Sequence, residues 1–362
     1  MSQYDLLLDG KYYLRDVIIG SITLEDSLDD IAGRLTFDIA RVNGLKIDVG
    51  MDIKLLGVPY GTNTQKTMFA GVVYEIRSSR EGAGTVSVTC YDRAKYLAIS
   101  EEQWQFKPGK ASDRLKKYAA AFSIPVGSIP DTGITLAKAL YRPQSIYSSI
   151  RKDLLETAQK GGKMYKPRMN ESSKLDLYEV GSNKTVFKLE DTAEDITQTR
   201  TMEGMVTKVK VVGQIPKKKT AKKKDDPKTP TKPKTLAATA ATGTSKGATN
   251  KEDVLYPVVA TKTGNTAKYG TLQRIYQKDD ADSVATAAKI AESMLTDTFK
   301  ETIGYSGAGV NVVRAGDKIQ LADYPTELIV RSVTLKLSDF DMMTLELATA
   351  KQIREDLYSG DN

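Results

Sequence analysis

The sequence predicts a mainly β protein with an α+β middle domain between two small antiparallel β-barrels. Short runs rich in Val, Ile, Thr and Tyr recur through residues 1–98, as in strands. Apolar residues at helical spacing interrupt this pattern from about residue 109, and strand-like alternation returns at 203–213. One long Lys/Pro/Thr-rich loop follows. A chain of 362 residues has room for two or three domains.

The first predicted barrel covers residues 1–98. Leu35, Phe37 and Ile39 alternate with polar residues, so one face of their strand is buried. Cys90 shares the face of Val86 and Val88, which predicts a small buried hydrophobe rather than a reactive thiol. As the one cysteine, it excludes an intrachain disulfide. The strand-like runs are 4–10, 16–27, 33–42, 52–58, 68–79 and 84–92.

The α+β middle domain is predicted at 99–200. Apolar residues recur at helical spacing in 111–122 and in 145–162. Ser145 is suited to cap the second helix, and Gly161-Gly162 to end it. Three strand-like runs joined by polar turns follow, at 163–171, 174–181 and 185–191.

The second barrel is predicted at 201–213 and 254–350, followed by a C-terminal tail at 351–362. An amphipathic helix over 283–299 packs against it, and acidic residues before that helix favour its N-terminus. These acidic residues are Asp279, Asp280 and Asp282. The barrel's strand-like runs are 203–213, 254–263, 318–322, 327–337 and 342–350.

The two halves of the chain echo each other. "VGMDIKLLG" at 49–57 matches "AGDKIQLAD" at 315–323, with a glycine before each strand. A long strand, a second strand and a short helix follow in both halves. Agreement in order and spacing over three consecutive elements predicts two related barrels.

The net positive charge of the chain comes from residues 214–253. The whole chain has a net charge of +7, and this segment has eleven lysines and four acids, so the remainder is neutral. The segment contains no aromatic residue for base stacking and too little apolar surface to fold. Three interpretations stay open: a solvated linker, docking to an acidic protein surface, or nucleic-acid binding by counterion release. The candidate docking residues are Lys217, Lys218, Lys219, Lys222, Lys223, Lys224, Lys228, Lys232 and Lys234.

The sequence predicts no catalytic, cofactor-binding or metal site, and no cofactor. Histidine is absent, which excludes Ser-His-Asp and Cys-His catalysis and imidazole zinc sites. The glycine-rich stretch 304–317 precedes a strand-like run, whereas a phosphate loop precedes a helix. Two groups of carboxylates are candidates for acid/base or metal sites, but a turn and a domain junction explain them more simply. These are Glu190, Asp191, Glu194 and Asp195, and Glu101-Glu102 beside Trp104.

No targeting or membrane segment is expected. The start "MSQYDLLLDGKYYL" lacks the basic residues and apolar core of a secretory leader. No apolar run approaches the roughly 18 residues that a membrane helix needs. The expected location is therefore the cytoplasm, or a particle assembled there.

The stretch 145–181 carries Leu154, Leu155, Ala158, Gly161, Gly162, Tyr165, Asn170, Leu175 and Leu177. A second stretch, "GVNVVRAGDKIQL", carries Arg314, Gly316 and Asp317, and a third is "EGMVTKVKVVG" at 203–213. In these three stretches the chain resembles the tail hub proteins of contractile-tailed phages, defective prophages and phage-tail-like bacteriocins, of the XkdQ, YqbQ and late-control-D type. The resemblance covers nearly the whole chain except 214–253.

The resemblance implies a structural protein, not an enzyme, with two tail-tube-like barrels. Three copies would form a homotrimeric ring of six barrels between a six-fold tail tube and a three-fold spike. The implied partners are the tube protein above, the spike protein below, and other baseplate and tape-measure proteins. DNA would at most pass through the channel, and no membrane insertion is implied. The implied location is the baseplate of a virion or tail-like particle, assembled in the bacterial host cytoplasm. Two alternatives remain: a peptidoglycan-degrading tail enzyme and a basic nucleic-acid-binding scaffold.

Overall fold

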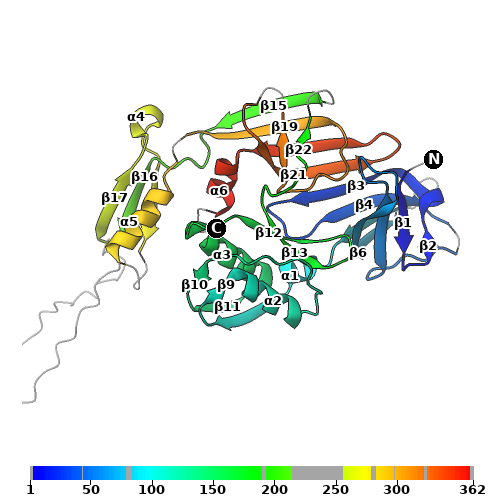
Figure 1. Cartoon of the computed structure of the whole chain (residues 1–362), viewed down its shortest axis with the longest axis horizontal. Coiled ribbons are helices and arrows are strands. Elements are labelled where there is room, and N and C mark those ends of the chain that lie inside the picture. Colours follow the sequence, from blue (N-terminus) through cyan, green and yellow to red (C-terminus); the bar gives the residue numbers. More distant parts are fainter. Residues whose placement is uncertain are drawn as a thin grey trace, which may run out of the picture. The chain divides into compact units, whose positions relative to one another are not determined.

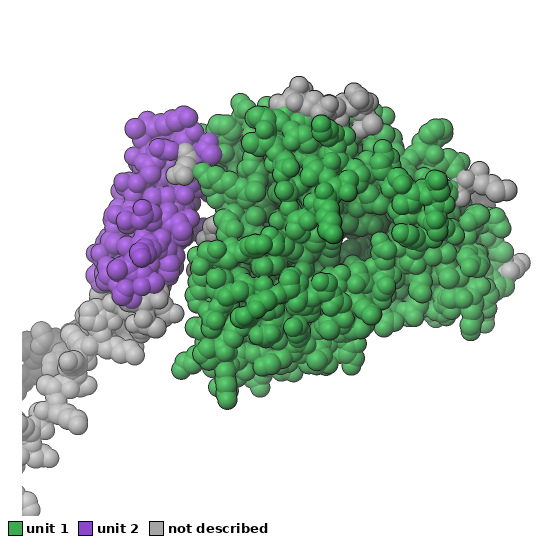
Figure 2. Space-filling view, viewed as in Figure 1, with its two compact units in different colours: residues 1–203, 299–362 green, residues 204–298 purple. Residues whose placement is uncertain are grey.

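The computed structural model describes residues 3–42, 44–78, 84–189, 193–213, 256–278, 283–296, 298–321 and 324–358. The chain forms two compact units, one of residues 1–203 and 299–362 and the other of residues 204–298 (Figure 2). Strands predominate, as predicted, and most of them belong to one large sheet (Figure 1). None of the described helices combines the length and the apolar character needed to cross a bilayer.

The large sheet has 13 strands in the order β15-β19-β22-β21-β3-β4-β7-β6-β5-β1-β2, and a branch in which β14 pairs with β20 and β20 with β21. The strands from the first part of the chain are β1 (Asp5–Leu8), β2 (Tyr12–Tyr13), β3 (Ile18–Ser27), β4 (Arg34–Ala40), β5 (Asp52–Gly57), β6 (Lys66–Ser78) and β7 (Thr85–Tyr91). A short 3-10 helix, η1 (Arg15–Val17), precedes β3. The later strands are β14 (Phe187–Lys188), β15 (Ala193–Thr201), β19 (Lys300–Ala308), β20 (Lys318–Gln320), β21 (Leu328–Leu337) and β22 (Met342–Ala348).

The two halves of this sheet share one strand topology. The order β3-β4-β7-β6-β5 in the first half corresponds to β15-β19-β22-β21-β20 in the second, and every neighbouring pair is antiparallel. A short helix follows each half, α1 (Lys95–Ile99) after β7 and α6 (Ala350–Tyr358) after β22. The predicted echo between the halves therefore corresponds to a duplicated five-strand arrangement.

The duplication extends to irregularities of the backbone. The register of β6 against β7 shifts between Val73 and Glu75. The register of β21 against β22 shifts between Val330 and Ser332, at the same place in the hairpin. A bulge inserts a residue and bends its strand, so both halves bend their longest strand at the same point.

A glycine before the third strand of each half makes the same hydrogen bond. Gly50 donates its N–H to the carbonyl of Val73, and Gly316 donates to the carbonyl of Val330, each at 2.8 Å. Their φ angles are +87° and +93°, a region that favours glycine. The glycines in the sequence echo thus hold equivalent turns.

The predicted pair of closed barrels is not found among the described residues. Strand β21 pairs with β3, from Ser332 opposite Ser27 to Leu337 opposite Ile22, and joins the halves into one open sheet. One apolar core runs through both halves. Cys90 lies in this core, fully buried as predicted, and burial raises the pKa of its thiol to about 12.

The middle region contains α2 (Ala111–Ala121) and α3 (Ile146–Gln159) around a core of their own. Ser145 caps α3, accepting the N–H of Ser148 at 3.1 Å, and Gly161 follows the helix with a φ of +87°, as predicted. Its strands are three two-stranded pairs: β8 (Glu101–Phe106) with β11 (Ala139–Ser145), β9 (Gly109–Lys110) with β10 (Thr135–Leu136), and β12 (Tyr165–Met169) with β13 (Leu175–Glu179).

The smaller unit contains a three-stranded sheet and a helix. Val209 and Val211 of the central strand pack against Ala287 and Ala291 of the helix. Ser283 caps this helix, which is shorter than the predicted 283–299. The elements are β16 (Lys208–Val212), β17 (Val258–Thr263), α4 (Thr266–Tyr269), β18 (Gln273–Gln277) and α5 (Val284–Ser293).

The predicted boundaries of the second β domain need correction. Residues 201–213 and 254–350 were expected to form one barrel, but 204–298 form their own unit between β15 and β19. The second half of the sheet instead begins at β15, although the sequence pattern predicts a turn around Glu194 and Asp195. Most of α6 lies in the predicted tail at 351–362, and its Ile353 and Tyr358 are buried, so this part of the tail packs against the rest of the unit.

Candidate functional site

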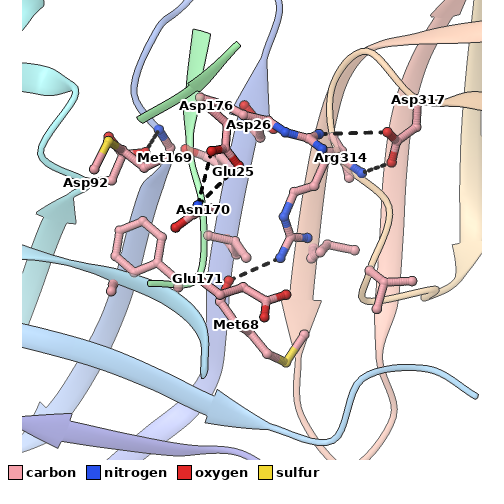
Figure 3. Close-up of a pocket in the computed structure, with 18 of the residues that line it drawn as sticks. Glu25, Asp26, Met68, Asp92, Met169, Asn170, Glu171, Asp176, Arg314 and Asp317 are labelled. Carbon is pink, nitrogen blue, oxygen red and sulfur yellow. Dashed lines mark hydrogen bonds and ion pairs between the residues drawn. The ribbon is translucent and has the colours of Figure 1, made fainter. Parts of the chain in front are cut away.

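A cavity of about 430 Å³ lies where the two sheet halves meet the middle region. Its wall comes from β3, from the turn between β12 and β13, and from the segment before β20 (Figure 3). Charged side chains cluster there, among them Asp26, Asp92, Arg168, Arg314 and Asp317. Sequence-distant parts of the larger unit are thus joined around polar groups.

Asp26 connects the middle region to both sheet halves. Lys166 of β12 is buried and forms an ion pair with the Asp26 carboxylate. The Lys166 Nζ also donates to the carbonyl of Ser27 at 2.6 Å. The other carboxylate oxygen of Asp26 accepts the N–H of Ala315 at 3.1 Å. A buried charge is tolerated only when it is paired and hydrogen-bonded, and these bonds meet that condition.

Arg314 fixes the turn that leads into β20. Its guanidinium donates to the carbonyls of Asn311 at 3.1 Å, Val313 at 3.0 Å and Met68 at 3.3 Å. The carbonyl of Met68 belongs to β6, so this side chain bridges the two halves of the sheet. The Arg314 N–H donates to Asp317 at 3.0 Å, which closes the turn.

Asp317 links the same turn to β13 and β12. Tyr178 donates its hydroxyl to Asp317 at 2.9 Å, and an Arg168 nitrogen lies 3.8 Å from the carboxylate. The Arg168 guanidinium also lies 3.7 Å from the centre of the Tyr178 ring. Burial raises the pKa of Asp317, against the lowering effect of the Arg314 N–H. The arrangement is a compact polar joint between three segments.

Asp92 lies on the wall of the cavity and closes the end of β7. One carboxylate oxygen accepts the N–H of Gly33 at 2.7 Å, and the other accepts that of Ala94 at 2.9 Å. Burial raises the pKa of Asp92 to about 7, although both N–H donors favour the charged form.

These charged groups contact one another or the backbone, which is the arrangement of a structural joint. Among the residues that the structure describes, no group of three or more His, Cys, Asp or Glu is placed to hold a metal ion. The hydrogen bonds and ion pairs of these groups hold the two sheet halves and the middle region together.

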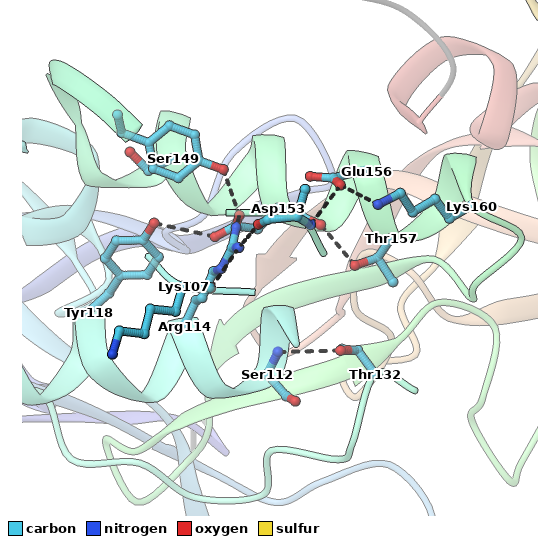
Figure 4. Close-up of polar contacts among 12 residues, drawn as sticks. Lys107, Ser112, Arg114, Tyr118, Thr132, Ser149, Asp153, Glu156, Thr157 and Lys160 are labelled. Atoms are coloured by element: carbon cyan, nitrogen blue, oxygen red, sulfur yellow. Dashed lines mark hydrogen bonds and ion pairs between the residues drawn. The ribbon is translucent and has the colours of Figure 1, made fainter. Parts of the chain in front are cut away.

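A second buried polar cluster lies between α2 and α3 (Figure 4). Arg114 donates to Asp153 at 2.5 Å and also to the carbonyl of Ala137. The hydroxyls of Tyr141 and Tyr118 donate to the same carboxylate at 2.6 Å and 3.3 Å. Burial raises the pKa of Asp153, and the Tyr141 hydroxyl and the Arg114 charge lower it. The cluster holds the two helices in one orientation.

The structure separates the carboxylates considered for catalysis. Glu101 and Glu102 lie exposed on β8, and Trp104 on the same strand stacks on Phe106 with ring centres 5.5 Å apart. Glu194 and Asp195 lie exposed on β15. The nine candidate docking lysines, together with Glu190, Asp191, Asp279, Asp280 and Asp282, lie outside the described residues.

Residues of the recognised motifs come together at the joint. Arg314, Gly316 and Asp317 form its turn, and Asn170 lines the cavity. Asp26, Asp92 and Lys166 were not found from the sequence. Asp26 lies between Leu24 and Leu28 in the alternation of its strand, and Lys166 lies between Tyr165 and Pro167, but neither pattern shows that a charged side chain turns inward.

A family model described as YqbQ-like matches residues 22–231, which is more than half of the chain. The chain belongs to the YqbQ-like family. The predicted resemblance to YqbQ and XkdQ is thereby confirmed.

Two relatives of this YqbQ-like chain come from Bacillus subtilis strain 168. YqbQ is 31% identical over 101 residues, covering 28% of this chain and 30% of that protein. The phage-like element PBSX protein XkdQ is 29% identical over 113 residues, covering 31% of this chain and 34% of that protein. The match thus spans about a third of the length of each relative.

The fold of this YqbQ-like chain is similar to that of a solved tail protein. The 43 kDa tail protein of prophage MuSo2 from Shewanella oneidensis superposes with a TM-score of 0.66. The superposition covers 96% of this chain and 98% of that one, at 12% identity. This likeness concerns the fold.

Proposed function

We propose that this YqbQ-like protein is a structural component of a phage-tail-like baseplate and serves as its central hub. The duplicated five-strand arrangement is the observation that carries the proposal. One chain supplies two equivalent β halves, so three chains around an axis supply six. Such a ring is suited to sit between a six-fold tube and a three-fold spike.

The polar joint and the helix cluster suit this role. A hub transmits force between a tube and a spike, so its parts must keep a fixed relation under load. Asp26, Arg314 and Asp317 connect the two sheet halves and the middle region through hydrogen bonds from several segments. The absence of histidine and the exposed positions of Glu101 and Glu102 favour a structural role over wall hydrolysis.

The lysine-rich segment is proposed to contact acidic neighbours in the particle. It leaves and re-enters the small unit at adjacent points, because Gly213 donates its N–H to the carbonyl of Pro257 at 2.8 Å. The segment is rich in lysine and has no aromatic residue, a composition that suits binding to an acidic protein surface better than stacking on bases. The segment carries Lys217 to Lys234 as its docking residues.

The test is the mass of the complex formed with the tube and spike proteins of the same particle. We expect the complex to contain three copies of this chain for each spike trimer. A complex with one or two copies would contradict the ring. Lysis of purified wall by the protein, lost on changing Glu101 or Glu102, would instead support an enzyme. Salt-dependent DNA binding that disappears with the lysine segment would support a nucleic-acid scaffold.

A further inference from the structure

Because the sheet is duplicated, each contact between strands can be compared with the equivalent contact in the other half. One such contact joins the two halves within the chain: β3 of the first half pairs with the C-terminal part of β21 of the second half, and we call this strand pairing a joint. The strand equivalent to β3 is β15, and the strand equivalent to β21 is β6. The corresponding joint would therefore be made by β15 and β6.

Both of these strands have an open edge in the single chain. Among the described residues, β15 pairs with β19 alone. Strand β6 pairs with β5 only as far as Val72, and beyond that point it pairs with β7 on the other side. Residues 75–78 thus have one edge free, as the equivalent residues of β21 would have without β3.

The side chains of β15 are exposed where those of β3 are buried. Ile22 and Leu24 of β3 are 2% and 4% exposed, beneath the joint with β21. Their equivalents by strand pairing are Ile196, which is 43% exposed, and Gln198, which is also exposed. A strand with unpaired backbone groups along one edge is a template for pairing with another chain.

The equivalent bulges in β6 and β21 show which residues of β6 would lie opposite which residues of β15. Val330 of β21 corresponds to Val73 of β6, so Ser332 corresponds to Glu75 and Thr334 to Arg77. The pairings with the neighbouring strands make Glu25 of β3 equivalent to Thr199 of β15. Since Thr334 lies opposite Glu25, Arg77 would lie opposite Thr199.

We propose that residues 198–201 of β15 in one copy pair antiparallel with residues 75–78 of β6 in a second copy, with Thr199 opposite Arg77. The partner is thus another copy of this chain, and the interface uses two different surfaces, as a closed ring requires. Three joints within chains would alternate with three between chains. This inference rests on the proposed hub function and specifies how its subunits meet.

The experiment uses cysteine cross-linking in the full-length chain assembled with its tube and spike proteins. The variant Arg77→Cys/Thr199→Cys places thiols on directly opposed residues, whose Cβ atoms lie about 5 Å apart in an antiparallel pair. The natural Cys90 is fully buried and will not compete. Mild oxidation should give covalent dimers and trimers on a non-reducing gel.

The matched control is Ser87→Cys/Thr199→Cys. Ser87 is exposed and lies opposite Arg77 on β7, so it is one strand farther from the proposed joint. It should give less than a tenth of the cross-linked product, as should each single cysteine variant. A three-copy complex without cross-linking at 77 and 199 would overturn the strand pairing and leave the hub intact. Cross-linked chains longer than three copies would support the pairing and overturn the closed trimer. If neither a three-copy complex nor cross-linked chains form, both the strand pairing and the trimeric hub are overturned.

Discussion

Arg114 of α2 and Asp153 of α3 form an ion pair 2.5 Å long in which each side chain is only 2% exposed. The two helices of the middle region are joined at this point, and two tyrosine hydroxyls donate to the same carboxylate. Removing one partner of a buried pair leaves the other charge uncompensated, whereas replacing both by apolar groups is far less costly.

We expect Asp153→Asn to lower the free energy of unfolding by about 3–5 kcal/mol, because Arg114 then stays buried without its counter-charge. The double variant Arg114→Met/Asp153→Leu should recover part of this loss. Urea denaturation of the three proteins checks the order. The control is Asp52→Asn, which removes the exposed pair with Arg93 and should change the midpoint little. Equal effects of Asp153→Asn and Asp52→Asn would contradict the assigned role.

Asp92 should make stability depend on pH. Its pKa is raised from 3.8 to about 7 in the folded protein, so between these values the folded state holds more protons than the unfolded state. Stability is therefore highest below about pH 4 for this group and falls as pH rises to about 7. The slope of unfolding free energy against pH in this window should become less negative in Asp92→Asn. An unchanged slope would show that Asp92 does not titrate there.

The equivalent glycines provide a matched pair of substitutions. Gly316→Ala and Gly50→Ala should each cost about 1 kcal/mol, because both residues have φ near +90°. At Gly50 a new Cβ meets nothing within 4 Å, and at Gly316 it meets Tyr178 at 3.4 Å, an ordinary contact. The two losses should therefore be similar in thermal unfolding. Gly109→Ala, without a positive φ, should have little effect. A loss confined to one of the two glycines would weaken their equivalence.

Deletion of residues 216–250 should leave the small unit folded. The strands on either side are already paired, with Val212 opposite Val258, so a short turn can replace the segment. If the lysines dock on acidic neighbours, particle yield should fall several-fold, and changing the nine docking lysines to Gln at full length should reproduce the fall. Counting particles by electron microscopy measures both. Unchanged yield and contraction would reduce the segment to a spacer.

Local chemistry was enough to predict most elements of the fold. Alternating apolar residues marked strands such as β4, and Ser145 with Gly161-Gly162 marked the ends of α3. The echo around Gly50 and Gly316 indicated the duplication. Strand β15 was missed because all but its terminal residues are exposed and it carries no apolar alternation. Its place in the sheet is set by pairing with β19, which a local pattern does not contain.

The polar joint could be predicted only in part. Arg314, Gly316 and Asp317 are neighbours in sequence, and their turn was recognised as a motif. Their partners come from distant segments: Met68 lies 246 positions away from Arg314, and Tyr178 lies 139 positions away from Asp317. The separation of the small unit was also missed, since its strands have the same alternation as those of the large sheet. Which strand pairs with which depends on long-range packing.

The small unit begins and ends at neighbouring points of the large sheet, since Thr201 at the end of β15 lies opposite Lys300 at the start of β19. In the first half, the same position is occupied only by the short connection between β3 and β4. The same five-strand arrangement therefore forms whether a folded unit or a few residues connect its first two strands. This connection is a site at which evolution or an engineer could exchange the inserted unit and keep the sheet unaltered.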